Sequence, residues 1–528
     1  MDTRIIKKRE IGFLFIAFII CAVVVLKYYN PMYLETFGKQ SLLQFAYFKY
    51  IIQMEITPKP KTAIPEAAPD SLKTIPILLY HGISTNKTQS GVNGEGRTVL
   101  LKDFESQMFA LHAAGYRTIT LAQFVAFREG KAHLPDKPIM ITFDDAIKTS
   151  YYRADPIFHA LGYNAIMFTI SGHALGAPSR YYLSKSELKT MIRSGRWQVE
   201  SHGDLSHQSI PTNATGIHGN FLSNKMYREK NRSGTQNPGL ETTAEYQARI
   251  TSDLESAKNS LEKAFGIQII GFAFPFNDFG QATKNFPGSG NIILPVASSI
   301  YPLLFYQAWT ETGYSQNYSY EQSPLVKRIE VPPNTSGTEL LEKIEQGETK
   351  NLPFSDSFNQ NRGWLEMWGS ATIKNKQLVI SSSDTDSASV FLDGTGYWTN
   401  YDFSASTNWI AGKDLEMEAH LKNNQNFLSC LFQAGGGVYA KETKNNTSEI
   451  LKDVFPPEGV PHGNHTFGIA VDGNKVSCFI DGDAIVSGES DGTLAEGGIG
   501  IKTWDPETGG AHVNIEQVLV STTSPSQP

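Results

Sequence analysis

The chain has 528 residues, of which 19% are charged, and a formal net charge of −7 at pH 7. This length is enough for two or three folded cores, because one domain usually takes about 100–200 residues. The acidic balance, with no block of Lys and Arg beyond the N-terminus, argues against a nucleic-acid partner, since nucleic-acid-binding proteins need a basic face for the phosphates.

The N-terminus has the pattern of a membrane anchor. Four basic residues within the first nine precede an apolar run from Ile11 to Leu26. Basic residues stay on the cytoplasmic side of a span, so the pattern predicts a single-pass anchor over residues 1–29 with the rest of the chain outside the cytoplasm. The run is shorter than the ~20 residues of a usual span, and Lys27 with the tyrosines after it can extend the helix into the interface. A removed signal peptide is the alternative, although no small-residue cleavage site follows.

Residues 30–73 are predicted to be a juxtamembrane segment and a linker. Residues 41–56 are rich in aromatic side chains. They fit a helix on the membrane surface and equally a helix packed on the domain that follows. Prolines recur from Thr57 to Pro69, which predicts a semi-rigid spacer.

Two apolar strands that end in metal-binding residue types carry the main functional signal. Residues 138–143 predict a buried strand ending at Asp144 and Asp145, and residues 197–200 predict another ending just before His202 and His207. The carboxyl ends of parallel strands meet at one end of barrel and open α/β enzymes. We therefore expect the four side chains to lie together.

These four residues divide naturally into metal ligands and a base. One carboxylate and two imidazoles are a common ligand set for a catalytic divalent metal, zinc in particular, with a position left for water. Asp145, His202 and His207 are the predicted ligands, and Asp144 is left to take a proton from water. The pattern predicts metal-assisted hydrolysis of an acyl group. Each motif alone also fits ordinary strand-end or loop residues, and it is the combination that favours a site.

Two segments follow the histidines. Residues 208–239 are rich in Asn, Ser and Gly and predict an insertion, either a cap over the cleft or a disordered loop. Residues 242–265 predict a helix with Thr243 as its N-cap, because apolar residues recur at helical spacing at positions 250, 254, 257, 261 and 265.

The sequence changes character after Lys350. Short alternating runs replace helical patterns, with Asp-Gly turn signals at positions 393, 472, 481 and 491. Residues 351–522 are therefore predicted to form a β-sandwich. Cys430 and Cys478 fall in predicted strands, where a disulfide and two buried free thiols fit equally well. Aromatic faces for sugar stacking or for core packing are offered by Trp364, Trp368, Trp398, Trp409 and Trp504.

Five stretches of residues 74–348 carry a family resemblance: 77–83, 104–120, 142–145, 201–207 and 271–276. In these stretches the chain resembles the polysaccharide deacetylases of the NodB-homology type, carbohydrate esterase family four. The Tyr-His opening and the Phe-Ala-Phe-Pro-Phe form are most similar to the poly-N-acetylglucosamine deacetylase branch. The resemblance implies a distorted (β/α) barrel with fewer than eight repeats, Asp144 as base, and zinc or a similar divalent ion held by Asp145, His202 and His207. It also implies N-deacetylation of an acetylated amino sugar.

The chain departs from the family pattern at three places. Ala273 stands where the family usually has Arg, and Arg328 is the candidate to orient Asp144 instead. Ala146 replaces the usual glycine and slightly disfavours a positive-φ turn. Residues 281–350 contain no histidine, although the family usually supplies a general acid there. His81 and His218 are the substitutes. A hydrogen-bonded structural histidine fits position 81 as well, and a solvent-exposed loop residue fits position 218.

Substrate-binding candidates come from aromatic segments. Phe274, Pro275 and Phe276 predict a turn that can aim a backbone N–H at a developing oxyanion, or a core turn with two buried rings. Trp309 fits a sugar cleft or a core. Residues 471–482 and 497–501 resemble concanavalin-like and laminin-G-like jelly rolls, which often bind glycans.

The sequence thus predicts a membrane-anchored, metal-dependent hydrolase that removes N-acetyl groups from an acetylated polysaccharide outside the cytoplasm. An O-acetyl esterase acting on a glycan is one alternative, because only the leaving group differs. A catalytically silent glycan-binding protein is the other, favoured by the missing late histidine and by Ala273.

Overall fold

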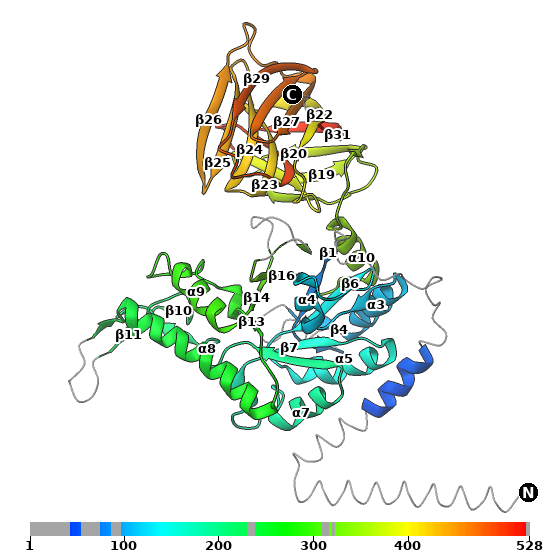
Figure 1. Ribbon diagram of the computed structural model, residues 1–528, viewed down its shortest axis with the longest axis vertical. Coiled ribbons are helices and arrows are strands. Elements are labelled where there is room, and N and C mark those ends of the chain that lie inside the picture. Colours follow the sequence, from blue (N-terminus) through cyan, green and yellow to red (C-terminus); the bar gives the residue numbers. More distant parts are fainter. Residues whose placement is uncertain are drawn as a thin grey trace, which may run out of the picture.

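The computed structural model describes residues 43–53, 74–85, 97–229, 238–308, 316–318, 321 and 323–523. The predicted anchor, most of the linker and Trp309 lie outside these residues. Within the described part, no helix combines the length and the apolar character needed to cross a membrane. Figure 1 shows a helix-covered barrel and a separate all-β body above it.

Seven parallel strands close into the barrel. Around the ring they are β2 (Ile77–Tyr80), β16 (Leu325–Glu330), β14 (Leu303–Gln307), β13 (Gly271–Ala273), β8 (Trp197–Ser201), β7 (Ala165–Thr169) and β6 (Pro138–Phe143), and β6 pairs back with β2. β5 (Arg117–Thr118) pairs with the first two residues of β6. The prediction of a (β/α) barrel with fewer than eight repeats is confirmed.

Helices lie in most of the connections between the parallel strands and cover the barrel. They are α3 (Leu101–Ala113), α4 (Leu121–Arg128), α5 (Lys148–Leu161), α6 (Ser171–Ala174), α7 (Lys185–Arg193), α8 (Thr243–Phe265), α9 (Gly290–Ile300) and α10 (Gly337–Gln346). A short parallel pair, β3 (Ile83–Ser84) and β4 (Val99–Leu100), precedes α3. The strands are buried on both faces, which explains their continuous apolar runs.

Helix α8 buries the apolar residues that recur at helical spacing in the sequence. Its apolar positions Ile250, Leu254, Ala257 and Leu261 are fully buried. The N-cap is Thr242, one residue before the predicted Thr243, because Thr242 and Glu245 form a reciprocal capping box.

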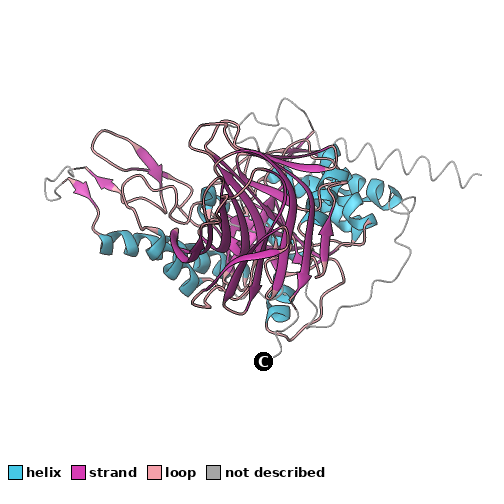
Figure 2. Ribbon diagram, turned by 90° about the horizontal axis from the view of Figure 1, so that it is seen from above, coloured by secondary structure: helices cyan, strands magenta, loops and turns pink. Residues whose placement is uncertain are grey.

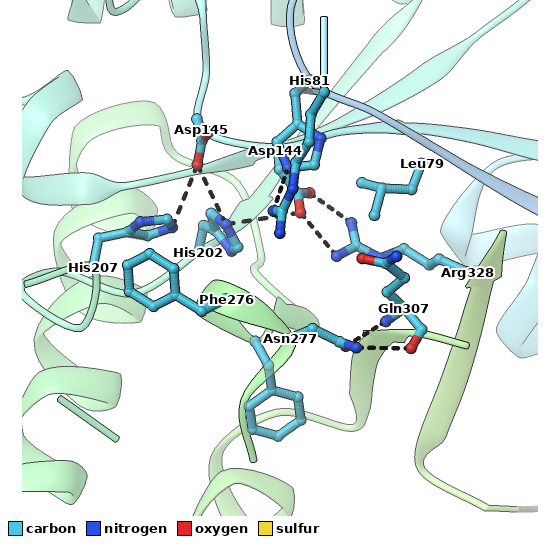
Figure 3. A pocket seen from close by; sticks show the side chains of 12 residues that line it. Leu79, His81, Asp144, Asp145, His202, His207, Phe276, Asn277, Gln307 and Arg328 are labelled. Atoms are coloured by element: carbon cyan, nitrogen blue, oxygen red, sulfur yellow. Dashed lines mark hydrogen bonds and ion pairs between the residues drawn. The ribbon is translucent and has the colours of Figure 1, made fainter. Parts of the chain in front are cut away.

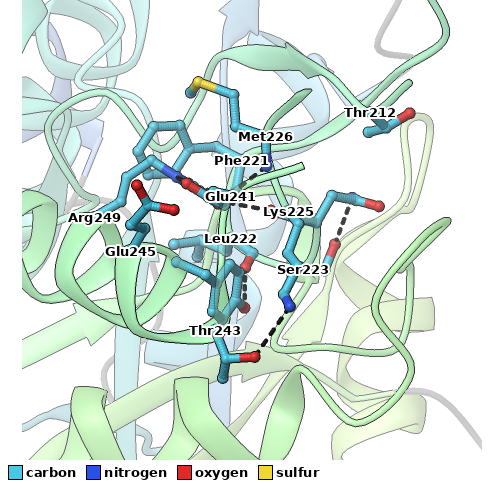
Figure 4. Close-up of polar contacts among 12 residues, drawn as sticks. Thr212, Phe221, Leu222, Ser223, Lys225, Met226, Glu241, Thr243, Glu245 and Arg249 are labelled. Atoms are coloured by element: carbon cyan, nitrogen blue, oxygen red, sulfur yellow. Dashed lines mark hydrogen bonds and ion pairs between the residues drawn. The ribbon is translucent and has the colours of Figure 1, made fainter. Parts of the chain in front are cut away.

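The insertion after the histidines is folded where it is described. It holds the hairpin of β9 (Ser209–Pro211) and β10 (His218–Asn220) and the pair of β11 (Tyr227–Arg228) and β12 (Gly239–Leu240). Figure 4 shows the contacts that hold it: Arg249 of α8 donates to the Glu241 carboxylate and, at 2.8 Å, to the Phe221 carbonyl. Its described residues do not line the pocket presented below.

The C-terminal body is a two-sheet antiparallel sandwich, so the all-β prediction is confirmed. In Figure 2 its strands run side by side in curved layers. One sheet contains β19 (Ser370–Lys374), β20 (Gln377–Ser381), β31 (His512–Thr522), β22 (Tyr401–Ala411), β27 (Gly463–Asp472), β28 (Lys475–Ile480) and β29 (Asp483–Glu489), with β17 (Phe354–Asp356) beside β31. The other contains β18 (Trp364–Trp368), β21 (Ser387–Leu392), β30 (Gly498–Trp504), β23 (Asp414–Asn423), β24 (Asn426–Gln433), β25 (Val438–Lys444) and β26 (Thr447–Val454).

The sandwich core is apolar and is crossed by a disulfide. Cys430 on β24 and Cys478 on β28 are bonded and join the two sheets. Among the tryptophans proposed as sugar platforms, three are buried in this core, Trp364, Trp398 and Trp409. Core packing is therefore the role of these three.

The sandwich contacts the barrel at the amino-terminal end of the strands. β1 (Thr74–Ile75), which leads into β2, pairs with β15 (Asn317–Tyr318). The Tyr318 hydroxyl donates to Asp393 Oδ1 at 3.0 Å and accepts from the Gly394 amide at 3.0 Å. Lys350 Nζ reinforces the joint by donating to the carbonyls of Glu348 and Asp393.

Candidate active site

The two adjacent aspartates face one pocket because the chain turns sharply after β6. Asp145 and Ala146 both take left-handed backbone conformations, with φ of 70° and 56°. The turn redirects Asp145, which in a continuing strand would point away from Asp144. A left-handed alanine costs about 1 kcal/mol, and this turn forms at Ala146 all the same. Ala146 is buried, and its carbonyl accepts the Leu183 amide at 2.8 Å.

Asp145, His202 and His207 form a compact cluster (Figure 3). Asp145 Oδ1 lies 3.5 Å from His202 Nε2 and 3.3 Å from His207 Nε2. Asp145 and His202 are buried, and the His207 side chain is 19% exposed. Asp145 Oδ1 and His207 Nε2 are shielded from solvent, and neither has a hydrogen-bond partner among the residues that the structure describes. Buried polar atoms are almost always satisfied, so two such atoms beside a second imidazole fit a divalent cation.

His202 is oriented by the backbone of β13. Its Nδ1 lies 2.8 Å from the Ala273 carbonyl, which can only accept, so Nδ1 carries the hydrogen. The lone pair of Nε2 is then directed at the cluster, as in metal sites where the far ring nitrogen is held by a carbonyl. Ala273 stands where the family pattern has an arginine, and it contributes to the site through its backbone carbonyl.

Asp144 is clamped by Arg328 from β16. Arg328 Nη1 lies 2.5 Å from Asp144 Oδ1 and Nη2 lies 2.8 Å from Oδ2, a two-point contact between two buried side chains. Burial raises the pKa of Asp144, but the charge of Arg328, followed by His202, the hydrogen bonds from Arg328, and His81, together more than offset this effect and hold the pKa below its ordinary value. Asp144 is therefore ionised, and its Oδ2 lies 3.7 Å from His202 Nε2.

His81 lines the same pocket from the carboxyl end of β2. Its Nε2 lies 3.4 Å from Arg97 Nη1, and a guanidinium can only donate, so Nε2 accepts. Burial lowers the pKa of His81, which is a neutral imidazole at pH 7.

The three motif residues 274–276 lie in different environments in the structure. Phe274 is buried and lines the pocket, and Pro275 begins the 3-10 turn η2 (Pro275–Asn277). Phe276 has a φ of 58° and is 41% exposed, with its ring centroid 4.8 Å from that of His207. The core alternative is therefore wrong for Phe276, because the left-handed backbone turns its ring out of the core.

Several pocket residues were missed from the sequence: Leu79, Arg97, Asn277 and Gln307. Gln307 ends β14 and is held by Asn277, whose Nδ2 donates to the Gln307 carbonyl at 2.9 Å (Figure 3). Its place at a strand end was a usable signal. Arg97 lies outside the barrel strands, and we find no pattern in the sequence that identifies it.

Comparison with known proteins agrees with this geometry. Residues 131–286 match the family described as polysaccharide deacetylase. A poly-β-1,6-N-acetyl-D-glucosamine N-deacetylase of Staphylococcus aureus (strain MRSA252) is 33% identical over 123 residues, covering 23% of this chain and 42% of that protein. The enzyme of the same name from Escherichia coli (strain K12) is 26% identical over 195 residues, covering 34% of this chain and 28% of that protein.

The matched segments thus span less than half the length of either relative. Among solved structures, a de-N-acetylase from Aggregatibacter actinomycetemcomitans aligns with 51% of this chain and 98% of that one, at 18% identity and a TM-score of 0.42. The match over residues 131–286 includes Asp144, Asp145, His202 and His207, and it identifies a polysaccharide deacetylase domain in this chain.

Proposed function

We propose that the chain is a metal-dependent hydrolase that removes N-acetyl groups from an amino-sugar polysaccharide outside the cytoplasm. The observation that carries the proposal is the cluster of Asp145, His202 and His207 beside an Asp144 that Arg328 keeps ionised. The names of the relatives point to a polymer of N-acetylglucosamine as the substrate class.

Three residues would hold the metal, for which zinc is the first candidate. Asp145 Oδ1 and the Nε2 atoms of His202 and His207 are the ligand atoms. A divalent cation held there supplies Lewis acidity toward a carbonyl and acidifies water. The negative charge of the buried Asp145 carboxylate also favours binding of a divalent cation, because without a cation this charge stays unneutralised.

Asp144 is the proposed general base. It is ionised, and Arg328 fixes both of its oxygens in one orientation, so the carboxylate does not need to reorganise before it accepts a proton from water. Arg328 is a positioning residue in this scheme, because its contact in the pocket is Asp144.

The departing amine needs a proton, and two groups in the pocket can supply it. Asp144 holds one after it has deprotonated water. His81 is the other candidate, and as a neutral imidazole it must first gain a proton. The two routes differ in their dependence on pH, which separates them experimentally.

The sugar would be bound by the aromatic wall. Phe276 presents an exposed ring next to His207, where a pyranose can stack on it. Phe274 and Pro275 support the turn that places this ring, and Trp309 remains a proposed contact outside the described residues.

The location outside the cytoplasm has two supports. The first is the basic-then-apolar pattern of residues 1–29. The second is the disulfide between Cys430 and Cys478, since disulfides persist mainly in oxidising compartments.

Acetate release from purified full-length chain tests the activity. We expect release from N-acetylglucosamine oligomers, loss of both bound metal and release in His202→Ala, and loss of release with metal retained in Asp144→Asn. His218→Ala is the matched control, because this histidine is exposed and lies outside the pocket. Release from O-acetylated glycans alone would favour the esterase, and glycan binding without any release would refute an enzyme.

A further inference from the structure

One helix of the described chain presents an outer face on which large apolar side chains predominate. Residues 43–53 form a helix in which four large apolar side chains are solvent-exposed. Phe45, Phe48 and Ile52 follow the spacing of a single helix face, and Ile51 lies at its edge. Their exposed fractions are 77% for Phe45, 68% for Phe48, 47% for Ile52 and 40% for Ile51. Such a concentration on a soluble surface marks an interaction site.

The opposite face of this helix is fixed to the barrel. The Tyr47 hydroxyl donates to Asp155 on α5, and the Tyr50 hydroxyl donates to Glu105 on α3. The exposed Lys49, at the edge of the apolar face, adds a contact of 2.9 Å between its Nζ and the same Glu105. Asp155 is itself held by Trp197 Nε1 at 2.7 Å. The helix therefore cannot roll its apolar face inward without breaking these contacts.

The sequence indicates what covers the exposed face. The apolar run that ends at Leu26 precedes Phe45 by only 19 residues. A chain of that length reaches at most roughly 60 Å, at about 3.3 Å per residue. If the run lies in a bilayer, the helix is confined to the region next to that bilayer.

We propose that the face formed by Phe45, Phe48, Ile51 and Ile52 inserts into the interfacial layer of the lipid bilayer that holds the N-terminus. The proposal rests on the proposed location of the chain and gives the barrel a defined orientation on the membrane. Helices with one apolar face lie in the plane of the interface with that face in the acyl boundary. In Figure 1 this helix, dark blue, is on the α3 and α5 side of the barrel and far from the sandwich.

The test uses full-length chain reconstituted into phosphatidylethanolamine and phosphatidylglycerol vesicles. In a Cys21→Ser background, Phe48→Cys is labelled with an environment-sensitive fluorophore, and Cys430 and Cys478 are protected as a disulfide. Ile450→Cys, on the sandwich and 55% exposed, is the matched control. We expect lipid-borne quenchers to reduce the signal at position 48 several-fold more than at position 450, and aqueous iodide to show the reverse.

Two further measurements make each outcome decisive. Extraction of the vesicles with alkali tests the anchor separately, so equal iodide quenching at both positions in an alkali-resistant chain overturns the docking and leaves the location intact. Protection of position 48 that grows with the protein-to-lipid ratio also overturns it, because the occupant is then a second copy. Phe45→Ser/Phe48→Ser is expected to release acetate from soluble oligomers at the unmodified rate, so a failure of the proposed activity is seen independently of the docking.

Discussion

Arg328 and Asp144 face each other through two parallel hydrogen bonds of 2.5 and 2.8 Å, although Asp144 directly follows β6 and Arg328 lies on β16, 184 residues later in the chain. The pairing places a permanently charged guanidinium in the buried pocket. Breaking such a pair typically costs about 3–5 kcal/mol, because one charge is left unpaired.

Replacement of this arginine is expected to impair activity and to change its pH dependence. In Arg328→Met the largest of the contributions that offset burial is lost, so the pKa of Asp144 rises. The base is then protonated at pH values where the unmodified enzyme is active, and the acid limb of the rate profile moves to higher pH. Acetate release measured across pH checks this, with Arg328→Lys as the conservative variant. An unchanged acid limb in Arg328→Met contradicts the assignment of Asp144 as base.

Removal of the metal is expected to abolish activity and to lower stability. Within the described residues, Asp145 Oδ1 and His207 Nε2 have no hydrogen-bond partner, so a chelator leaves them unsatisfied. A ligand present at 100 times its Kd stabilises by about 2.7 kcal/mol, which calorimetry resolves as a lower melting temperature. Asp145→Asn is expected to bind less metal and to show little further response to the chelator. A chelator response as large as that of the unmodified chain argues against Asp145 as a ligand.

The strained turn predicts a stabilising substitution. Ala146 has a φ of 56°, a conformation that glycine adopts without the cost paid by alanine. Ala146→Gly is therefore expected to stabilise the barrel by about 1 kcal/mol, as measured by calorimetry of the full chain. Ala165→Gly in β7 is the control, since that residue is buried in a regular strand and its replacement is expected to destabilise. Equal destabilisation by both changes would refute the strain.

Glu200 predicts a pH dependence of stability that is independent of the pocket aspartates. Burial raises its pKa from 4.5 to about 8, while its Oε2 accepts the amides of Ile270 and Gly271. The folded state therefore binds more protons than the unfolded state between these two values. Its contribution to stability is complete below pH 4.5 and is lost as the pH rises through 8. Glu200→Gln keeps an acceptor and should flatten this decline in denaturation measured across pH. Glu449→Gln on the exposed face of β26 should leave the decline in place.

The exposed ring of Phe276 predicts an effect on substrate affinity. Phe276→Ala is expected to raise KM for N-acetylglucosamine oligomers by up to about tenfold, because one aromatic stacking contact is worth about 0.5–1.5 kcal/mol. The value of kcat should change less, since the ring is not among the proposed proton-transfer groups. Leu205→Ala is the control, a residue that is 47% exposed and does not line the pocket. A fall in kcat with KM unchanged would place Phe276 in the chemistry instead.

The sequence predicted the parts of the site that follow from strand geometry. The end of an apolar run predicts the end of a buried strand, and parallel strands bring their carboxyl ends to one place, so Asp144 and His202 could be expected to lie together. Gln307 obeys the same rule, but glutamine has no distinctive catalytic pattern. Arg97 depends on where a connection folds back, which local sequence does not encode. The sequence left Phe276 open between a substrate contact and a core residue, because its left-handed backbone is set by the surrounding turn and not by its own preference.

The hydroxyl of Tyr318 ties the sandwich to the end of the barrel where the strands begin, whereas the pocket opens where they finish. A polymer bound by the sandwich would have to extend along the side of the barrel before any of its sugars could reach Asp144. The two bodies would then engage widely separated stretches of one strand, or two different strands. Oligosaccharides too short to bridge that path would gain nothing from the second body, so the benefit of the sandwich would grow with the length of the glycan.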